Sequence, residues 1–406
     1  MLALAAASRI AILCLALLSD RLLPDHVPSG VEKLRENGEH LGCLRAFARW
    51  DSVYYLNIAQ HPQLYSQERE FAFLPLYPLL IATLSFMLRY IIPGIGSLSA
   101  AVIAGLIISN ACFVVSHYVL SEICKDDVDA RGLRRTILML HLLSPANVFF
   151  SSSIYTESLY ALLSWSGILL LQRNCWLLSL LPFTAASYTR SNGSLNFIII
   201  ALTLLRRFEV KREKRMGWSD FFTNDLLQLV LQLSLSLVAT LLPFIMHNLR
   251  AHNFACQSSG CETGGINPLH FVGSYARIQE RYWGVGILSY WHIKQIPNFL
   301  LSLPIYILSA STLIRRARRV HVDSFLRGRF LADPYTTHMI ALLSVCGLVA
   351  HVEVSTRVLL SACPHLYFEA AFLTARNYPL TGCIVTYFIG YTLIGTALHA
   401  NFFPWT

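Results

Sequence analysis

Four long stretches of this chain, residues 98–120, 226–249, 296–314 and 378–406, contain no Asp, Glu, Lys or Arg. A helix needs roughly 20 apolar residues to cross the hydrocarbon core of a bilayer, and helices satisfy their own backbone hydrogen bonds there. Only 14% of the residues are charged, against about 25% in a typical soluble domain. The sequence therefore predicts an all-α bundle that spans a membrane several times.

Shorter apolar segments lie between these runs, and prolines such as Pro78, Pro145 and Pro182 interrupt several of them. Counting each sufficiently apolar segment gives about ten or eleven transmembrane helices in a single integral-membrane domain, residues 1–406. The first helix would cover residues 2–19. We expect it to be retained rather than cleaved as a signal peptide, because its charged start is weak.

Basic side chains gather in two short loops, near residues 206–215 and 315–329. Cytoplasmic loops carry an excess of Lys and Arg, so both loops are expected in the cytoplasm. The polar segment 248–295 and the first polar segment, residues 20–70, then face the other side, the first with short helices in the membrane interface. This distribution accounts for the net charge of +9 without a nucleic-acid partner. Residues 121–135 carry both signs of charge and are not assigned to a side.

The first polar segment contains Arg49, Trp50 and Asp51 in succession. A carboxylate at the edge of a membrane is costly to keep and is often functional. Because an arginine and an aromatic ring flank it, we expect chemistry at Asp51.

Other polar and aromatic residues fall on the same predicted side of the membrane. They are Tyr155, Glu157, Arg190, Asn192, Arg281, Tyr282, Trp283 and Arg357. Arginine binds phosphate through two parallel hydrogen bonds, and aromatic rings offer a flat apolar surface to a sugar. This face therefore suits a lipid that carries a phosphate and a sugar.

Each of these residues also has a plainer structural interpretation. Asp51 would be a helix N-cap, and Glu157 the ion-pair partner of an arginine. Arg190 and Arg357 would neutralise buried acids or extend toward the headgroups. The rings of Tyr282 and Trp283 would belong to the aromatic belt. The gathering on one side, rather than any single residue, indicates a site.

Ten cysteines are scattered along the chain, most of them inside apolar runs. Cys256 and Cys261 lie in the polar segment 248–295, where either a local disulfide or two free thiols is compatible with the sequence. No Cys or His spacing resembles a zinc site, and we expect no metal.

Several short stretches resemble the PIG-V family of glycosylphosphatidylinositol (GPI) mannosyltransferases. They spread in order over nearly the whole chain, at residues 49–59, 71–78, 144–149, 155–159, 190–193, 279–283, 294–301, 356–357 and 401–406. The family often has a glycine near the position of Leu76, and residues 121–135 match nothing in it. Neither departure touches Asp51.

The resemblance implies a glycosyltransferase of the GT-C class in the endoplasmic reticulum membrane with a lumenal active site. It implies dolichyl phosphate mannose as donor substrate, no cofactor, and α1,6 transfer of the second mannose. The acceptor would be mannosyl-glucosaminyl-(acyl)phosphatidylinositol, and a small accessory membrane subunit is compatible with the family. Members keep an acidic residue in the first lumenal loop, and Asp51 matches it.

A β-linked donor and an α-linked product require inversion, for which a single carboxylate base suffices. We assign that role to Asp51. The donor phosphate would be bound by arginines, listed by preference as Arg357, Arg190, Arg281 and Arg49. Sugars or lipid would contact Trp50, Tyr155, Glu157, Asn192, Tyr282 and Trp283.

Three rival functions remain open at this point. A multipass lipid transporter or scramblase would use the same arginines to escort a phosphate headgroup. A non-catalytic subunit of a glycosylation complex would not need Asp51. Another GT-C mannosyltransferase would use the same donor with a different acceptor, because one fold hosts many acceptors.

Overall fold

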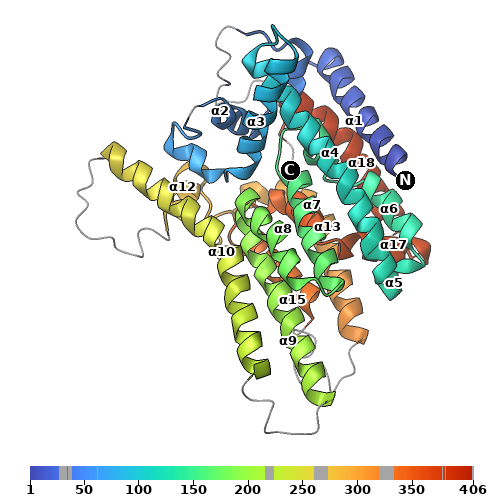
Figure 1. Cartoon of the computed structure of the whole chain (residues 1–406). Helices are drawn as coiled ribbons and strands as arrows, with labels where there is room; N and C mark the ends of the chain where they lie inside the picture. Colours follow the sequence, from blue (N-terminus) through green and yellow to red (C-terminus); the bar gives the residue numbers. More distant parts are fainter. Residues whose placement is uncertain are drawn as a thin grey trace.

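The computed structural model describes residues 1–26, 34, 39–61, 63–214, 224–259, 273–319, 333–376, 378–379 and 381–404. All regular secondary structure in these ranges is helical, so the all-α expectation is confirmed. Figure 1 shows an elongated bundle with the first polar segment folded over one end.

Within the described residues, five helices are long and apolar enough to cross a membrane: α1 (Leu2–Leu22), α4 (Ser97–Asp126), α10 (Asn224–Ser259), α13 (Ile296–Arg319) and α18 (Thr381–Ala400). The segment formed by η6 (Val352–Val354) and α16 (Ser355–Ala362) is bent by 90° against α17 (His365–Ala375), which follows after a short break. If the two parts count as one broken span, the described residues contain a sixth span. The chain is thus a multi-pass membrane protein, but the count of ten or eleven crossings is not confirmed.

The remaining long helices explain this difference. They are α3 (Leu76–Ile91), α7 (Glu157–Gln172), α8 (Trp176–Thr189), α9 (Asn196–Lys214) and α15 (Pro334–Leu348). Four of them are shorter than the roughly 20 residues that a spanning helix needs, and α9 ends in a strongly basic turn. The count from the sequence therefore includes described helices that do not meet the length criterion, and the number of full crossings stays a prediction.

Short helical segments complete the described structure. They are η1 (Gly42–Phe47), α2 (Ser52–Gln60), η2 (Glu68–Ala72), α5 (Val128–Arg131), α6 (Arg134–Leu142), η3 (Val148–Ser152), η4 (Ser191–Leu195), α12 (Ser274–Trp283) and η5 (Ile293–Gln295). Three of these, η1, α2 and η2, lie in the first polar segment, where short helices were expected.

The segment 248–295 is more helical than a loop. Helix α10 continues to Ser259, and α12 follows within the same segment. The extension packs on the first polar segment: the rings of Phe254 and Phe71 lie 5.2 Å apart, and His247 Nε2 lies 2.7 Å from the carbonyl oxygen of Phe71. Tertiary packing therefore continues the helix past the end of the apolar run.

Small residues allow the central helices to approach closely. A Cβ atom on Gly167 of α7 would lie 2.7 Å from the ring of Phe183 on α8, and one on Gly105 of α4 would lie 2.7 Å from Ile154. Close backbone approach through small residues is typical of helix packing in membranes. Helix α7 is thereby held between α4 and α8.

Candidate active site

Asp51 is held at the start of α2 by contacts to residues about one hundred positions later. Its backbone N–H donates to the hydroxyl of Tyr155 at 3.1 Å, and Ser52 Oγ accepts from the backbone N–H of Ile154 at 3.1 Å. Asp51 occupies the N-cap position of α2, yet its side chain makes no capping hydrogen bond. The N-cap interpretation therefore does not account for the carboxylate.

The carboxylate of Asp51 belongs to a cluster of two acids and two arginines. Its Oδ2 lies 3.5 Å from Arg357 Nη2. Arg357 Nε lies 3.7 Å from Glu157 Oε1, which also accepts from Arg190 Nη1 at 2.5 Å. The charges alternate along the chain of contacts from Asp51 to Arg190, so we call these four residues the charge cluster. Four residues nominated from the sequence are thus brought together.

Burial differs within the charge cluster in a way that assigns roles. The side chain of Glu157 is fully buried, those of Arg357 and Arg190 are 15% and 17% exposed, and that of Asp51 is 30% exposed. A buried charge is tolerated when paired, and Glu157 has two arginine partners. Among the described residues Asp51 has one ion-pair partner, Arg357, and its side chain is the most exposed of the four, so it is the carboxylate of the cluster that is more accessible to solvent.

Glu157 and Arg190 are placed by the ends of two helices. Glu157 is the first residue of α7, where the helix dipole favours a negative charge. Arg190 follows the last residue of α8, and its Nη1 also donates to Thr156 Oγ1 at 3.0 Å. The ion-pair interpretation of Glu157 is therefore correct in this structure, and Arg190 and Arg357 neutralise a buried acid.

The turn after Arg190 depends on a glycine. A Cβ atom on Gly193 would lie 2.6 Å from the backbone of Ala186 and Ser187 in α8. Because backbone atoms cannot move aside easily, this close approach requires glycine.

Gly193→Ala is therefore expected to displace the turn and with it Arg190. We expect a loss of transfer activity of about tenfold or more, since a misplacement of about 1 Å at a site costs up to ~100-fold. The matched control is Ser194→Ala, at the next residue. It removes a hydroxyl whose hydrogen bond within the described part of the chain stays inside the turn, to the Ser191 carbonyl oxygen at 2.8 Å. Activity of the two variants at equal protein levels is the measurement, and equal activities would refute the steric argument.

Aromatic rings cover Arg357. Its guanidinium carbon lies 4.9 Å from the ring centre of Phe149 and 5.2 Å from that of Tyr155. The ring of Tyr155 also lies 5.9 Å from His399 of α18. Cation–π contacts of this kind hold an arginine in place, so Tyr155 positions both Arg357 and the backbone of Asp51.

The surroundings raise the pKa of Asp51 above its usual range. Burial is the main cause, and the negative charge of Glu157 acts in the same direction, while Arg357 and Arg190 oppose it. A raised pKa makes a carboxylate a better proton acceptor near neutral pH. The arrangement can therefore perform general base chemistry beside fixed positive charge.

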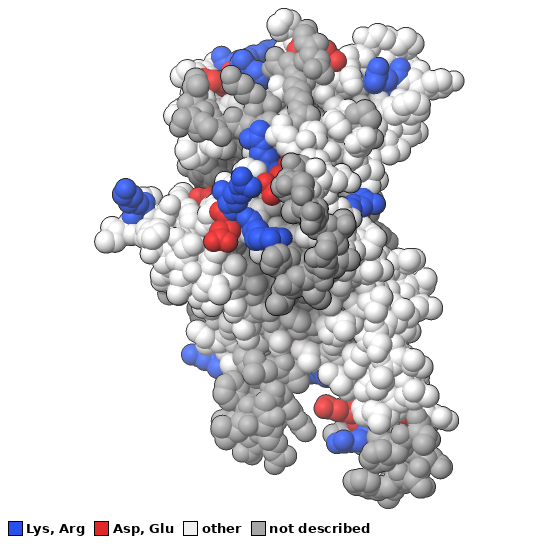
Figure 2. All heavy atoms as spheres, turned by 90° about the vertical axis from the view of Figure 1, so that its left-hand side faces the viewer, with Lys and Arg blue, Asp and Glu red and all other residues white. Residues whose placement is uncertain are grey.

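Three nominated residues of α12 lie apart from the charge cluster. Arg281 Nη1 pairs with Glu68 Oε2 at 3.0 Å and is 69% exposed, and Tyr282 donates to the same oxygen at 2.9 Å. Only Trp283 packs toward α2, with its ring 5.8 Å from those of Tyr54 and Phe73. In Figure 2, blue and red side chains gather near the middle of the face on which α12 lies.

Arg49 is occupied by other partners. Its Nη2 lies 2.9 Å from both Asp20 Oδ1 and Asp25 Oδ1, and its Nε donates to the carbonyl oxygen of Ala400 at 3.1 Å. Among the described residues it makes no ion pair with Asp51. Arg49 therefore joins the end of α1, the first polar segment and the end of α18.

Trp50 and Asn192 each present a buried nitrogen without a partner in the described part of the chain, Nε1 and Nδ2 respectively. Trp50 has a positive φ of 52° and its ring lies 5.7 Å from Phe402. A left-handed backbone at a bulky residue is uncommon and often marks a functional site. It turns the chain between Arg49 and Asp51, so the two side chains go to different partners.

A sequence profile of the mannosyltransferase (PIG-V) family matches residues 1–406. The chain belongs to this family. The mouse GPI alpha-1,6-mannosyltransferase 2 is 29% identical over 98% of this chain and 96% of its own length, and the human protein of that name is 28% identical over 99% and 97%. The Drosophila melanogaster GPI mannosyltransferase 2 is 24% identical over 99% of this chain and 98% of its own length.

Among solved structures, the oligosaccharyltransferase of Archaeoglobus fulgidus is 11% identical. The match covers 98% of this chain and 53% of that one, with a TM-score of 0.46. The family match, rather than the similarity to this solved structure, identifies the chain as a glycosyltransferase that transfers mannose.

Some residues around the charge cluster of this mannosyltransferase were not nominated from the sequence. Thr156 lies between Tyr155 and Glu157 and bonds Arg190, so adjacency was an available signal. His399 is the one histidine in the apolar run 378–406, which has no Asp, Glu, Lys or Arg, and such residues within membrane spans are often functional. Phe149 lies at the end of the family-like stretch 144–149, but nothing in the sequence pointed to a contact with an arginine.

Two expectations are not tested by the structure. Cys261 lies outside the described residues, so the pairing of Cys256 with Cys261 stays open. No group of three or more His, Cys, Asp or Glu side chains within the described ranges is arranged to hold a metal ion. The absence of a metal from the reaction remains a prediction.

Proposed function

We propose that this mannosyltransferase transfers the second mannose in GPI assembly. The donor is dolichyl phosphate mannose, the acceptor is mannosyl-glucosaminyl-(acyl)phosphatidylinositol, and the new bond is α1,6. The names of the mouse, human and fly relatives support the reaction. We place the reaction at the lumenal face of the endoplasmic reticulum in a single GT-C type domain.

In the proposed mechanism, Asp51 acts as general base in one displacement. The attacking hydroxyl of the acceptor is a poor nucleophile and needs a base within hydrogen-bond reach. The single observation that carries this assignment is the position of Asp51 as the most exposed carboxylate of the charge cluster, 3.5 Å from Arg357. The same arginine is within reach of a leaving phosphate placed beside the base.

The donor phosphate would exchange partners with Asp51. Glu157 is fully buried and contacts both Arg190 and Arg357, so it holds the two guanidinium groups in fixed positions. A phosphate that takes Arg357 from Asp51 frees the carboxylate for the acceptor and gains a preorganised positive charge. Donor binding would thus prime the base before the acceptor reacts.

Sugar contacts are proposed for groups whose polar atoms lack partners among the described residues. These are Asn192 Nδ2, Glu157 Oε2 and Trp50 Nε1. Buried polar atoms are normally hydrogen-bonded, so a substrate hydroxyl at these atoms would complete them. The ring of Trp283, next to Tyr54 and Phe73, would contact a sugar face or the first isoprene units.

The pH dependence follows from the raised pKa of Asp51. The base works only when deprotonated, so kcat/KM should fall as the pH drops through a value above about 3.9, the ordinary pKa of Asp. Arg357 lowers this pKa, so Arg357→Ala should move the acid limb to higher pH. The test is the pH profile of kcat/KM for the wild type and for Arg357→Ala. If the acid limb of the variant does not move, the assignment of this limb to Asp51 is contradicted.

The reaction itself is tested in microsomes from cells that lack GPI mannosyltransferase 2. The chain is expressed, labelled dolichyl phosphate mannose is supplied, and the GPI lipids are resolved. Conversion of the one-mannose to the two-mannose intermediate, with the label released by an α1,6-mannosidase, supports the proposal. Mannose transferred to another lipid would indicate a different acceptor. No transfer by the folded protein, alone or with an accessory subunit from a relative's organism, would favour a transporter or a non-catalytic subunit.

A further inference from the structure

A hollow of about 470 Å³ lies at the far end of α8 from Arg190, between the starts of α8 and α10 and the end of α9. Helix α8 has 14 residues, which places the two ends roughly 21 Å apart. The hollow is therefore separate from the charge cluster. Its volume is in the range of small-molecule sites, about 300–1,000 Å³.

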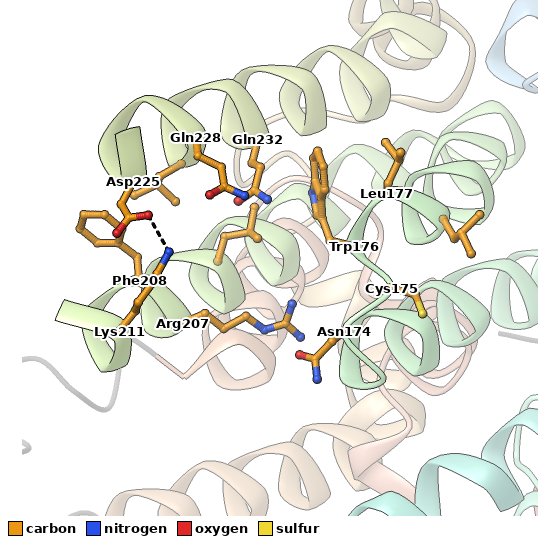
Figure 3. Close-up of a pocket in the computed structure, with 13 residues that line it drawn as sticks. Asn174, Cys175, Trp176, Leu177, Arg207, Phe208, Lys211, Asp225, Gln228 and Gln232 are labelled. Carbon is orange, nitrogen blue, oxygen red and sulfur yellow. Dashed lines mark hydrogen bonds and ion pairs between the residues drawn. The ribbon is translucent and has the colours of Figure 1, made fainter. Parts of the chain in front are cut away.

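The hollow lies where α9 changes from apolar to basic. Figure 3 shows Arg207 and Lys211 of α9 on one wall, with Gln228 and Gln232 of α10 pointing down toward them. Residues 196–205 of α9 contain no charged side chain, whereas Arg206, Arg207, Lys211 and Arg212 follow. This boundary is the depth at which lipid headgroups meet the hydrocarbon core.

The polar side chains that line the hollow are held in place, but some of their hydrogen-bonding groups have no partner among the described residues. Arg207 donates through Nη2 to the carbonyl oxygen of Leu171 at the end of α7 and makes no other hydrogen bond with the described residues. Lys211 pairs with Asp225 at 2.5 Å. The side-chain amides of Gln228, Gln232 and Asn174 bond no residue in the described ranges. In the described lining, Arg207 and Lys211 outnumber Asp225, so two cations and one acid lie beside three amides.

The walls beyond these polar groups are apolar and exposed. Leu177 and Leu178 of α8 line the hollow and are more than half exposed, as is expected of side chains that contact lipid. Leu227 and Leu231 do not line the hollow, but they lie on the same helix as Gln228 and Gln232 and are also more than half exposed. Trp176, whose indole N–H bonds Ser236 Oγ at 3.0 Å, lines the hollow between the two kinds of surface. An occupant with an anionic headgroup and apolar tails would match both the polar side chains and the exposed leucines.

We propose that this hollow binds an anionic glycerophospholipid of the leaflet that faces the basic loops. Its phosphate would lie between Arg207 and Lys211, its polar head would contact the amides of Gln228, Gln232 and Asn174, and its chains would lie along the exposed leucines. A second hollow of about 550 Å³ on the other side of α9 also includes Arg207 and Lys211. The two cations are therefore reachable from both sides of the helix.

The test uses the full chain in nanodiscs and a phosphatidylserine probe with a photoreactive group near the glycerol. Label should concentrate in residues 174–178 and 228–232 and should be competed by unlabelled phosphatidylserine. Equal competition by phosphatidylcholine would overturn the anionic specificity. Competition by soluble glycerol phosphate at the same concentration would overturn a membrane lipid as the source.

Three variants make the test independent of folding. Arg207→Gln should weaken labelling about tenfold, the cost of a charge-assisted hydrogen bond. Gln228→Trp, at an exposed position, should block the hollow without removing a cation. Arg212→Gln is the matched control, because Arg212 lies on the same helix but lines neither hollow. Wild-type labelling in Gln228→Trp, or equal losses in Arg207→Gln and Arg212→Gln, would overturn the proposal.

Discussion

Replacing Asp51 by Asn is expected to abolish mannose transfer while the protein still folds. The amide keeps the size of the side chain but cannot accept a proton, and loss of a general base costs about 10²- to 10⁴-fold in rate. The raised pKa of Asp51 means that the folded protein stabilises the protonated, neutral form. Stability from this group is thus greatest at low pH and declines as the pH rises through that pKa, so a neutral Asn should cost no stability at neutral pH.

Asp25→Asn is the matched control for this change. Asp25 lies in the same polar segment, is partly exposed, and pairs with Arg49 and Arg45 rather than with the charge cluster. We expect its activity within a few-fold of wild type, because the buried Arg49 keeps Asp20 and the carbonyl oxygen of Ala400 as partners, and the exposed Arg45 pair contributes about 0–1 kcal/mol. Both variants are compared by transfer rate and by thermal unfolding midpoint. A full loss of activity in Asp25→Asn would show that the segment, not the base, is sensitive.

Arg357→Ala is expected to lose about 10²-fold or more in transfer rate, because it removes the positive charge that faces the leaving phosphate. The loss should be larger for use of the lipid donor than for binding of the acceptor. Glu157 keeps Arg190 as a partner at 2.5 Å, so the variant does not leave a buried acid without a counter-charge. Donor and acceptor concentrations are varied separately to measure the two effects.

Arg281→Ala is the control for the second change. Arg281 was nominated for the same role, but it is exposed and pairs with Glu68. It should lose little activity if the charge cluster alone binds the phosphate. If Arg357→Ala weakens the use of the donor and the binding of the acceptor equally, Arg357 has a structural role instead.

The sequence predicted which acids and arginines gather better than it predicted their individual contacts. Asp51, Glu157, Arg190 and Arg357 meet, as their predicted placement on one side suggested. Arg49 and Arg281 were assigned to the same side but are engaged by Asp20, Asp25 and Glu68. Which acid captures which arginine depends on the geometry of short helices and turns, and residue spacing does not encode that geometry.

Helix lengths were also only partly predictable. The helix predicted over residues 2–19 is present, because this apolar run is long enough to form one, and α1 extends only three residues further. Helix α10 exceeds its apolar run because Phe254 and His247 pack against Phe71. The predicted number of crossings is not confirmed, since some apolar runs form helices below the length criterion, such as α8, with 14 residues around Pro182. Packing between distant segments decided these boundaries.

Single-turnover transfer by purified wild type and Asp51→Asn, both saturated with dolichyl phosphate mannose, tests the central claim most directly. Donor binding is measured on the same samples. The account predicts donor binding in both proteins and a rate about 10²- to 10⁴-fold lower in the variant. A variant that binds donor and transfers mannose at the wild-type rate would contradict Asp51 as the base.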